Sequence, residues 1–213
     1  MEGKSGRGVP IFMKSVLAEE FNEKKPMPGM DYKWVKSQGT GKAEFPDKLY
    51  LVCKERLLLF DYFADFQGFI ISTEFLKLFN RYSSMEGYQL VPLETISWKG
   101  KKITEKQYYN LFPYHKEKWV DYQTSVFQIK QGKTLEDVIN KNGLLINKYE
   151  EIKLIESAMN KEVFTLSGAH LNSFLFCSEE FKHELEKAKL VGIDFISIEE
   201  FPTYYNKKYL YFL

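Results

Sequence analysis

The fold is decided by residues 69–94, which read FIISTEFLKLFNRYSSMEGYQLVPLE. A short apolar run ends at Ser72, the hydroxyl of Ser72 or Thr73 can cap a helix, and Glu74 then lies in the first turn, where a carboxylate meets the positive end of the helix dipole. Apolar residues at i, i+3, i+4 and i+7 form one helix face: Phe75, Leu78, Phe79 and Tyr82. Gly87 ends the connection, and residues 88–94 alternate as a strand. The stretch therefore predicts a strand–helix–strand unit.

A second stretch repeats this order, with LFCSEEFKHEL at 175–185 and GIDFISIE at 192–199. The positions that correspond to Ser72, Glu74, Phe75 and Phe79 are Ser178, Glu180, Phe181 and Leu185. Such a unit buries its helix on a sheet. We therefore expect an α+β fold, with a mixed or mostly antiparallel sheet and two short helices from a repeated strand–helix–strand unit. Duplication explains the repeat, although any two units of this kind share the pattern.

The domain organisation follows from the change in composition near residue 46. Residues 1–45 are rich in Gly, Lys, Pro and Met, which predicts a loosely structured N-terminal segment. Residues 46–213 are expected to form a single α+β domain, with pseudo-repeats at 46–122 and 123–213. Residues 95–122 are interpreted as an excursion between the copies, opening with a hairpin at Lys99–Gly100. Further predicted elements are strands at 49–53, 125–130, 151–157, 162–168, 174–177 and 193–198, and a helix within 133–143.

Net charge and hydropathy indicate which classes of partner the protein is expected to bind. The chain has 213 residues with 30 basic and 29 acidic side chains, a net charge of +1. A polyanion binder usually carries a basic excess, so this balance does not favour nucleic acid. The sequence contains neither a secretory signal nor an apolar run long enough to cross a membrane. We therefore expect a cytoplasmic protein without a membrane partner.

Residue types that carry catalysis are scattered. The three histidines lie far apart, at 115, 170 and 183, and the two cysteines, Cys53 and Cys177, each stand in an apolar run typical of a buried thiol. The GTGK sequence at 39–42 lacks the first glycine of a phosphate-binding loop. We therefore predict no catalytic residue, no metal site and no cofactor.

The most unusual segment is 106–122, in which aromatic and basic residues alternate. Aromatic side chains among bases can stack nucleic-acid bases, can anchor a protein interface, or can pin a loop to the core. The residues predicted to contact a partner are Tyr108, Tyr109, Tyr114 and Trp119.

Residues 162–198, EVFTLSGAHLNSFLFCSEEFKHELEKAKLVGIDFISI, resemble the C-terminal signature of a family of bacterial immunity proteins from polymorphic toxin systems. The matching positions are Phe164, Leu166, Ser178, Glu179, Phe181, Leu190, Gly192 and Phe195. WVDYQTSVF at 119–127 resembles the mid-chain segment of that family, so the resemblance covers about residues 49–198.

The resemblance implies a non-enzymatic protein that binds a cognate toxin domain one-to-one and neutralises it. Its motif residues form a cap and a core, so they are not expected to contact the toxin themselves. One alternative is a nucleic-acid or nucleotide-binding module that uses residues 106–122, and another is a small hydrolase with an unfamiliar site.

Overall fold

The computed structural model of the chain describes residues 1–3, 6–28, 34, 41–65, 68–168 and 170–209. The chain forms two compact units. The large-sheet unit holds residues 3–115 and 183–194, and the small-sheet unit holds residues 1–2, 116–182 and 195–213. Two short strands, β1 (Glu2–Gly3) and β12 (Ile193–Asp194), stand in the sequence where the chain passes between units. The division of the chain at residues 45 and 122 stays a prediction.

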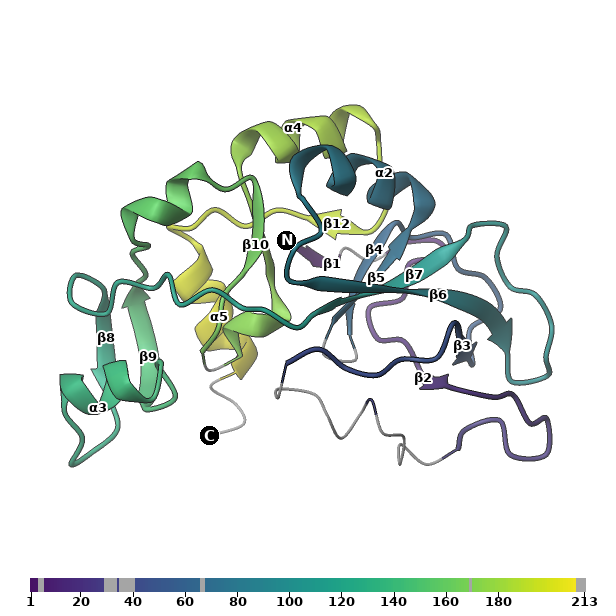
Figure 1. Cartoon of the computed structure of the whole chain (residues 1–213), viewed down its shortest axis with the longest axis horizontal. Coiled ribbons are helices and arrows are strands. Elements are labelled where there is room, and N and C mark those ends of the chain that lie inside the picture. The colour runs from purple at the N-terminus through teal and green to yellow at the C-terminus, as the bar shows by residue number, and fades with distance from the viewer. Residues whose placement is uncertain (4–5, 29–33, 35–40, 66–67, 169, 210–213) are drawn as a thin grey trace. The chain divides into compact units, whose positions relative to one another are not determined.

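The large-sheet unit contains a six-stranded sheet. Its strands are β2 (Ser15–Ala18), β3 (Leu49–Cys53), β4 (Tyr62–Asp65), β5 (Gly68–Ser72), β6 (Tyr88–Ser97) and β7 (Tyr108–Pro113) (Figure 1). Their order is β2-β3-β6-β7-β5-β4. Only β3 and β6 run parallel, and the other neighbours are antiparallel. The predicted α+β class with a mixed, mostly antiparallel sheet is confirmed.

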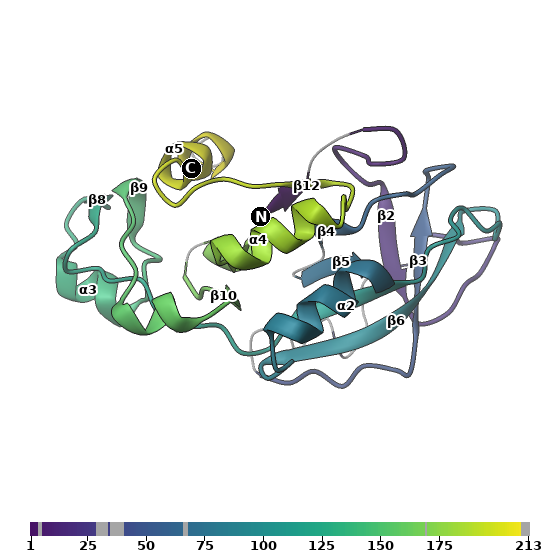
Figure 2. The same ribbon diagram turned by 90° about the horizontal axis from the view of Figure 1, so that it is seen from above.

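Helix α2 (Thr73–Tyr82) follows β5 directly and runs along the sheet (Figure 2). The Ser72 hydroxyl accepts a hydrogen bond from the Phe75 N–H at 3.2 Å, which makes Ser72 the N-cap. The helix buries Phe75, Leu76, Leu78 and Phe79. Each such side chain contributes about 1.5–3 kcal/mol relative to an exposed one. The strand–helix–strand unit predicted for residues 69–94 is confirmed.

Strand β7 corrects the interpretation of residues 95–122 as an excursion. The hairpin turn near Gly100 is confirmed, because the Ser97 N–H donates to the Lys101 carbonyl at 2.8 Å. After this turn, however, β7 enters the sheet between β5 and β6, where Tyr109 lies opposite Ile71 and Pro92. The segment YYNLFP is buried at five of its six positions, so its aromatic residues belong to an inner strand.

Part of residues 1–45 joins the same sheet. β2 pairs antiparallel with β3, and Val16, Leu17 and Ala18 are buried. Trp34 is also buried, in the core cluster that contains Leu49. The GTGK sequence at 39–42 lies partly outside the described residues.

The small-sheet unit is built from two hairpin-like strand pairs and short helices. Its elements are β8 (Val126–Ile129), α3 (Leu135–Asn140), β9 (Ile146–Glu151), the 3₁₀ turn η1 (Glu156–Asn160), β10 (Val163–Thr165), the 3₁₀ turn η2 (Leu171–Ser173), β11 (Leu175–Cys177), the start of α4 (Glu179–Lys187) and α5 (Phe201–Tyr209). β8 pairs antiparallel with β9, and β10 with β11. The predicted helix within 133–143 is confirmed, and a Thr134–Asp137 capping box begins it.

Two predicted strands are wrong or shortened, and one helix was not predicted. The strand expected at 151–157 is wrong, because β9 ends at Glu151 and η1 begins at Glu156. The strand expected at 193–198 is reduced to Ile193–Asp194. Helix α5 was not predicted, since FPTYYNKKY has weak helical periodicity and an early proline, which the first turn tolerates.

Helix α4 begins as α2 does. The Ser178 hydroxyl accepts a hydrogen bond from the Phe181 N–H at 3.1 Å, and Phe181 is fully buried. Both helices thus use a serine cap three residues before a buried phenylalanine. That the two strand–helix–strand segments arose by duplication stays a prediction.

Candidate functional site

The four aromatic residues predicted to contact a partner are partly or fully packed. Tyr108 is fully buried and its hydroxyl donates to the Phe60 carbonyl at 2.8 Å. Tyr109 and Tyr114 are half-buried in the same unit, and the Tyr114 hydroxyl accepts from the Gly87 N–H at 3.3 Å. Trp119 belongs to the small-sheet unit and packs edge-on against Phe164, with 5.0 Å between ring centroids. Their role toward a partner stays a prediction.

Lys106, the first basic residue of the segment 106–122, binds a buried carboxylate inside the large-sheet unit. Lys106 donates to the Asp61 carboxylate at 2.5 Å, and Asp61 is almost fully buried. A lysine held this way cannot track a phosphate backbone, and Tyr108 has no exposed ring face on which a base could stack. The nucleic-acid alternative for residues 106–122 is therefore not favoured.

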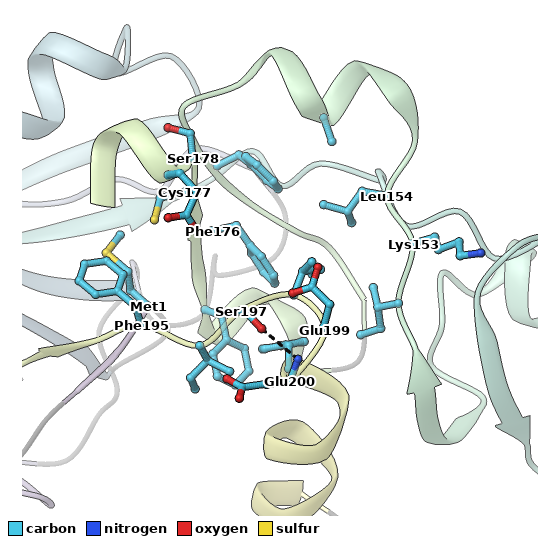
Figure 3. A pocket seen from close by; sticks show the side chains of 18 of the residues that line it. Met1, Lys153, Leu154, Phe176, Cys177, Ser178, Phe195, Ser197, Glu199 and Glu200 are labelled. Atoms are coloured by element: carbon cyan, nitrogen blue, oxygen red, sulfur yellow. Dashed lines mark hydrogen bonds between the residues drawn. The ribbon is translucent and has the colours of Figure 1, made fainter. Parts of the chain in front are cut away.

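The small-sheet unit contains an open hollow of about 860 Å³, which we call the aromatic hollow (Figure 3). Its volume lies within the ~300–1,000 Å³ typical of ligand pockets. Three chain segments supply most of its lining, residues 151–164, 174–182 and 195–202, and Met1 and Thr124 complete it. The sequence gives no sign of it, because these segments are separated by long stretches of chain.

Aromatic rings form the floor of the hollow. Phe164 on β10 stacks on Phe176 on β11, with 5.6 Å between centroids. Phe201, at the start of α5, packs edge-on against Phe176 at 5.4 Å and against Phe174 at 4.9 Å. Cross-strand and edge-to-face ring pairs of this kind are worth about 0.5–1.5 kcal/mol beyond area burial, so the floor is a rigid part of the unit.

The walls expose apolar side chains to the hollow. The wall residues that are only half-buried are Leu154, Phe195, Ile196 and Ile198, and Phe176 in the floor is half-buried as well. Met159, at the rim, is 75% exposed. A contiguous apolar surface rimmed by charged residues is typical of an interaction site.

The charges at the rim are unevenly paired. Lys153 lies 3.4 Å from Glu151, and Lys182 lies 3.0 Å from Glu179. Among the described residues Lys161, Glu199 and Glu200 have no ion-pair partner. A hydrogen bond from its own backbone N–H, and a second from Ser197, lower the pKa of Glu199, so this carboxylate is ionised at neutral pH. Figure 3 shows the Glu199 side chain reaching toward Phe176 and Leu154.

Cys177 is the one thiol in the lining, and its raised pKa lowers its reactivity as a nucleophile. Burial raises the pKa of the Cys177 thiol to about 11. Nucleophilic cysteines work as thiolates and have lowered pKa values. No histidine lines the hollow, and within the described part of the chain no three His, Cys, Asp or Glu side chains gather as metal ligands would. The arrangement is thus suited to contact rather than to bond-making at Cys177.

Slow alkylation of Cys177 is expected from its raised pKa. At pH 8 iodoacetamide should modify Cys177 about 100-fold more slowly than a cysteine of ordinary pKa, because the thiolate fraction falls by that factor. The rate should then rise about tenfold per pH unit up to pH 10. Site-resolved mass spectrometry measures both, with the synthetic peptide LFCSEEF (residues 175–181) as the matched unfolded control. Equal rates in protein and peptide would contradict the desolvated environment.

Comparison with known proteins gives the class of this chain. The sequence model of a family of immunity proteins matches residues 1–213. No curated protein matches the chain. Since the match spans the whole sequence, the chain belongs to the family described as Immunity protein 43 (Imm43). The resemblance to bacterial immunity proteins stated from residues 162–198 is confirmed at the level of the family. Within the described residues, no helix is both long and apolar enough to span a bilayer.

Proposed function

We propose that this protein binds the toxin domain of a bacterial polymorphic toxin system and neutralises it by one-to-one binding. The observation that carries the proposal is the match of an immunity-protein family over residues 1–213. A family of this kind implies a toxin as partner in general.

Inhibition by occupancy, rather than by chemical modification of the toxin, fits the aromatic hollow. Its only thiol has a raised pKa, and its carboxylates lie at an exposed rim instead of facing each other in a cleft. General acid–base work needs groups whose pKa values are shifted toward neutrality by burial or by neighbouring charges. The pKa of Glu199 is shifted the other way. We further propose that the complex forms in the cytoplasm.

Co-expression tests neutralisation directly. Cells that express the toxin domain encoded beside this gene should grow when the wild-type protein is present and die when it is replaced by an immunity protein of another family. The two purified proteins should co-elute as a one-to-one complex in size-exclusion chromatography with light scattering. Death of cells that contain folded protein, together with the absence of a complex at micromolar concentration, would refute the proposal.

A titration separates binding from catalysis. If the protein acts by occupancy, toxin activity in vitro should fall linearly and reach zero at one molar equivalent. An enzyme that modified the toxin would abolish activity at a small fraction of an equivalent, given time. The second result would retain neutralisation but replace the mechanism proposed here.

A further inference from the structure

We infer that the loop of residues 6–14 in the large-sheet unit contacts the toxin, and that it enters a toxin cleft that is apolar inside and bordered by aspartate or glutamate side chains. Figure 2 shows this loop leading into β2. The inference rests on the proposed function. It goes further by naming a contact surface and the chemistry of the partner surface that receives it.

Two adjacent apolar side chains stand out at the tip of the loop. Ile11 is 84% exposed and Phe12 is 81% exposed, more than any other large apolar residue in the described part of the chain. Burying such a side chain is worth about 1.5–3 kcal/mol. Single exposed apolar residues are common on protein surfaces, but large apolar side chains placed together are typical of binding hot spots. The pair is therefore suited to insertion into a partner.

The loop that carries this pair is anchored on both sides of the tip. Val9 and Met13 are buried in the core cluster of the large-sheet unit. The Gly8 carbonyl also accepts a hydrogen bond from the Leu59 N–H at 2.8 Å. The tip is thus presented from a fixed frame, which reduces the conformational entropy lost on binding.

The ends of β3 and β6 lie beside the loop. The Lys54 N–H donates to the Lys14 carbonyl at 2.9 Å, and the Trp98 N–H donates to the Cys53 carbonyl at 3.0 Å. The Lys54 ammonium lies 4.0 Å from the centre of the Trp98 ring. The segments that follow β3 and β6 therefore form one surface with the loop.

This surface carries an excess of positive charge. Residues 6–14, 53–59 and 97–105 contain seven basic and two acidic side chains. Of the two acids, Glu105 pairs with a neighbouring lysine at 2.5 Å, so Glu55 alone stands against the remaining bases. The exposed bases with no carboxylate partner in the described part of the chain are Arg7, Lys14, Lys54, Arg56, Lys99 and Lys101.

The excess persists when the adjoining segments are counted. Residues 19–25, whose Phe21 ring lies against Gly100, add three acids and two bases. Residues 189–194, which pack on Val9 through a glycine, add one of each. The surface then has ten basic and six acidic residues, although the whole chain carries a net charge of only +1. Its charge is complementary to an acidic partner surface.

The shape of the tip favours a protein cleft over a bilayer or a nucleic acid. Ile11 and Phe12 are both exposed over most of their surface, so a concave partner can enclose them from several sides. Electrostatic attraction to a lipid surface needs no fixed loop conformation, whereas a shape-matched cleft does. Base stacking would depend on Phe12 alone, because the half-buried Trp98 ring has the Lys54 ammonium over it.

Substitution at the tip tests the apolar contact. Ile11→Asp and Phe12→Asp are each expected to raise the Kd for the purified, catalytically inactivated toxin domain by at least about tenfold, because a carboxylate is costly to bury in an apolar cleft. Circular dichroism should show an unchanged fold, since both side chains lie in water in the free protein. Leu144→Asp, at another exposed apolar residue (58% exposed), is the control and should change the Kd by less than about twofold.

Charge reversal tests the acidic border of the cleft. The double variant Arg7→Glu, Lys101→Glu should lower the association rate constant at least about tenfold in about 0.1 M salt. In about 1 M salt, where charges are screened within about 3 Å, it should associate as fast as the wild type. The double variant Lys77→Glu, Lys141→Glu makes the same change in net charge outside this surface and should leave the rate constant within about twofold at both salt concentrations. Equal rates for the first double variant and the wild type in about 0.1 M salt would overturn the acidic border.

Photocross-linking tests the identity of the cleft. With p-benzoylphenylalanine at position 12, ultraviolet light should link the protein to toxin peptides that contain both large apolar residues and aspartate or glutamate. The same amino acid at position 144 should give no link. Linked peptides without a carboxylate would overturn the assignment of the cleft.

The outcomes separate this inference from the proposed function. If the wild-type protein fails to bind the toxin, the proposed function itself fails. If the wild type binds and the Ile11→Asp and Phe12→Asp variants bind equally well, neutralisation stands and the loop is not the contact surface. Vesicles of equal parts phosphatidylcholine and phosphatidylglycerol and a single-stranded oligonucleotide serve as the other ligands. If Phe12→Asp abolishes binding to either of them and leaves the Kd for the toxin unchanged, the loop serves a lipid surface or a nucleic acid, and the inference is also overturned.

Discussion

Replacing Asp61 by alanine is expected to lower the free energy of unfolding by about 3–5 kcal/mol, the usual cost of removing one partner of a buried ion pair. Asp61 is the only buried acidic residue among those described, and its carboxylate accepts three hydrogen bonds. The donors are the Ser72 hydroxyl at 2.6 Å, the Lys106 ammonium at 2.5 Å and the Val191 N–H at 2.7 Å. Without the carboxylate, a half-buried ammonium and a backbone N–H lose their acceptor. Urea unfolding followed by circular dichroism measures the loss.

A surface ion pair provides the matched control. Lys48 and Glu94 also lie 2.6 Å apart, but both side chains are about half exposed, at 54% and 47%. Water and salt screen such a pair, so Glu94→Ala should leave the unfolding midpoint nearly unchanged. The Asp61 result should also persist in 1 M NaCl, where exposed pairs are screened within about 3 Å. If the Asp61→Ala protein were as stable as the wild type, the three hydrogen bonds to the Asp61 carboxylate would not contribute to stability as proposed.

Phe181→Ala should cost about 3–5 kcal/mol, as large-to-small changes of a buried aromatic residue do. Phe181 is fully buried, and it stands at the third position after the Ser178 cap of α4. Removal of the ring loses its transfer free energy and leaves a cavity that the close-packed surroundings fill only in part. Thermal unfolding by calorimetry should show the lower midpoint.

The cap itself supplies the comparison for that variant. Ser178→Ala removes one side-chain acceptor at the helix N-terminus and is expected to cost only about 1 kcal/mol. The order of the two variants is therefore part of the prediction. A Phe181→Ala protein with an unchanged midpoint, or one less affected than Ser178→Ala, would contradict the packing of α4.

Local patterns predicted the elements whose stabilisation is local. The α2 helix was predicted from a cap, a first-turn carboxylate and an apolar face, and the structure uses each of them: Ser72, Glu74 and Phe75. These interactions join residues three or four apart in sequence, so the sequence contains both partners. The same reasoning failed for residues 151–157. Their apolar residues alternate with a period of two, which predicted a strand, but β9 ends at Glu151 and a 3₁₀ turn begins at Glu156. Alternation predicts a strand only if a neighbouring strand is present to pair with it.

The aromatic segment shows a different limit. Its composition suggested a binding surface, because aromatic and basic residues serve binding and packing alike. The structure places Tyr108 in β7, an inner strand that pairs with both β5 and β6. It also places the Lys106 ammonium on the buried Asp61 carboxylate. Nothing in the sequence of residues 106–122 indicates that this strand pairs between β5 and β6.

The sequence by itself determined the α+β class, the two capped helices and the family likeness carried by residues 162–198. Each depends on spacing within a short stretch of chain. Only the tertiary structure decided where Asp61 finds its partners, which lie up to 130 residues away, and that Phe164, Phe176 and Phe201 share one floor. Contacts of this kind arise when distant segments are brought together by burial of apolar surface, which is non-directional and leaves no fixed spacing in the sequence.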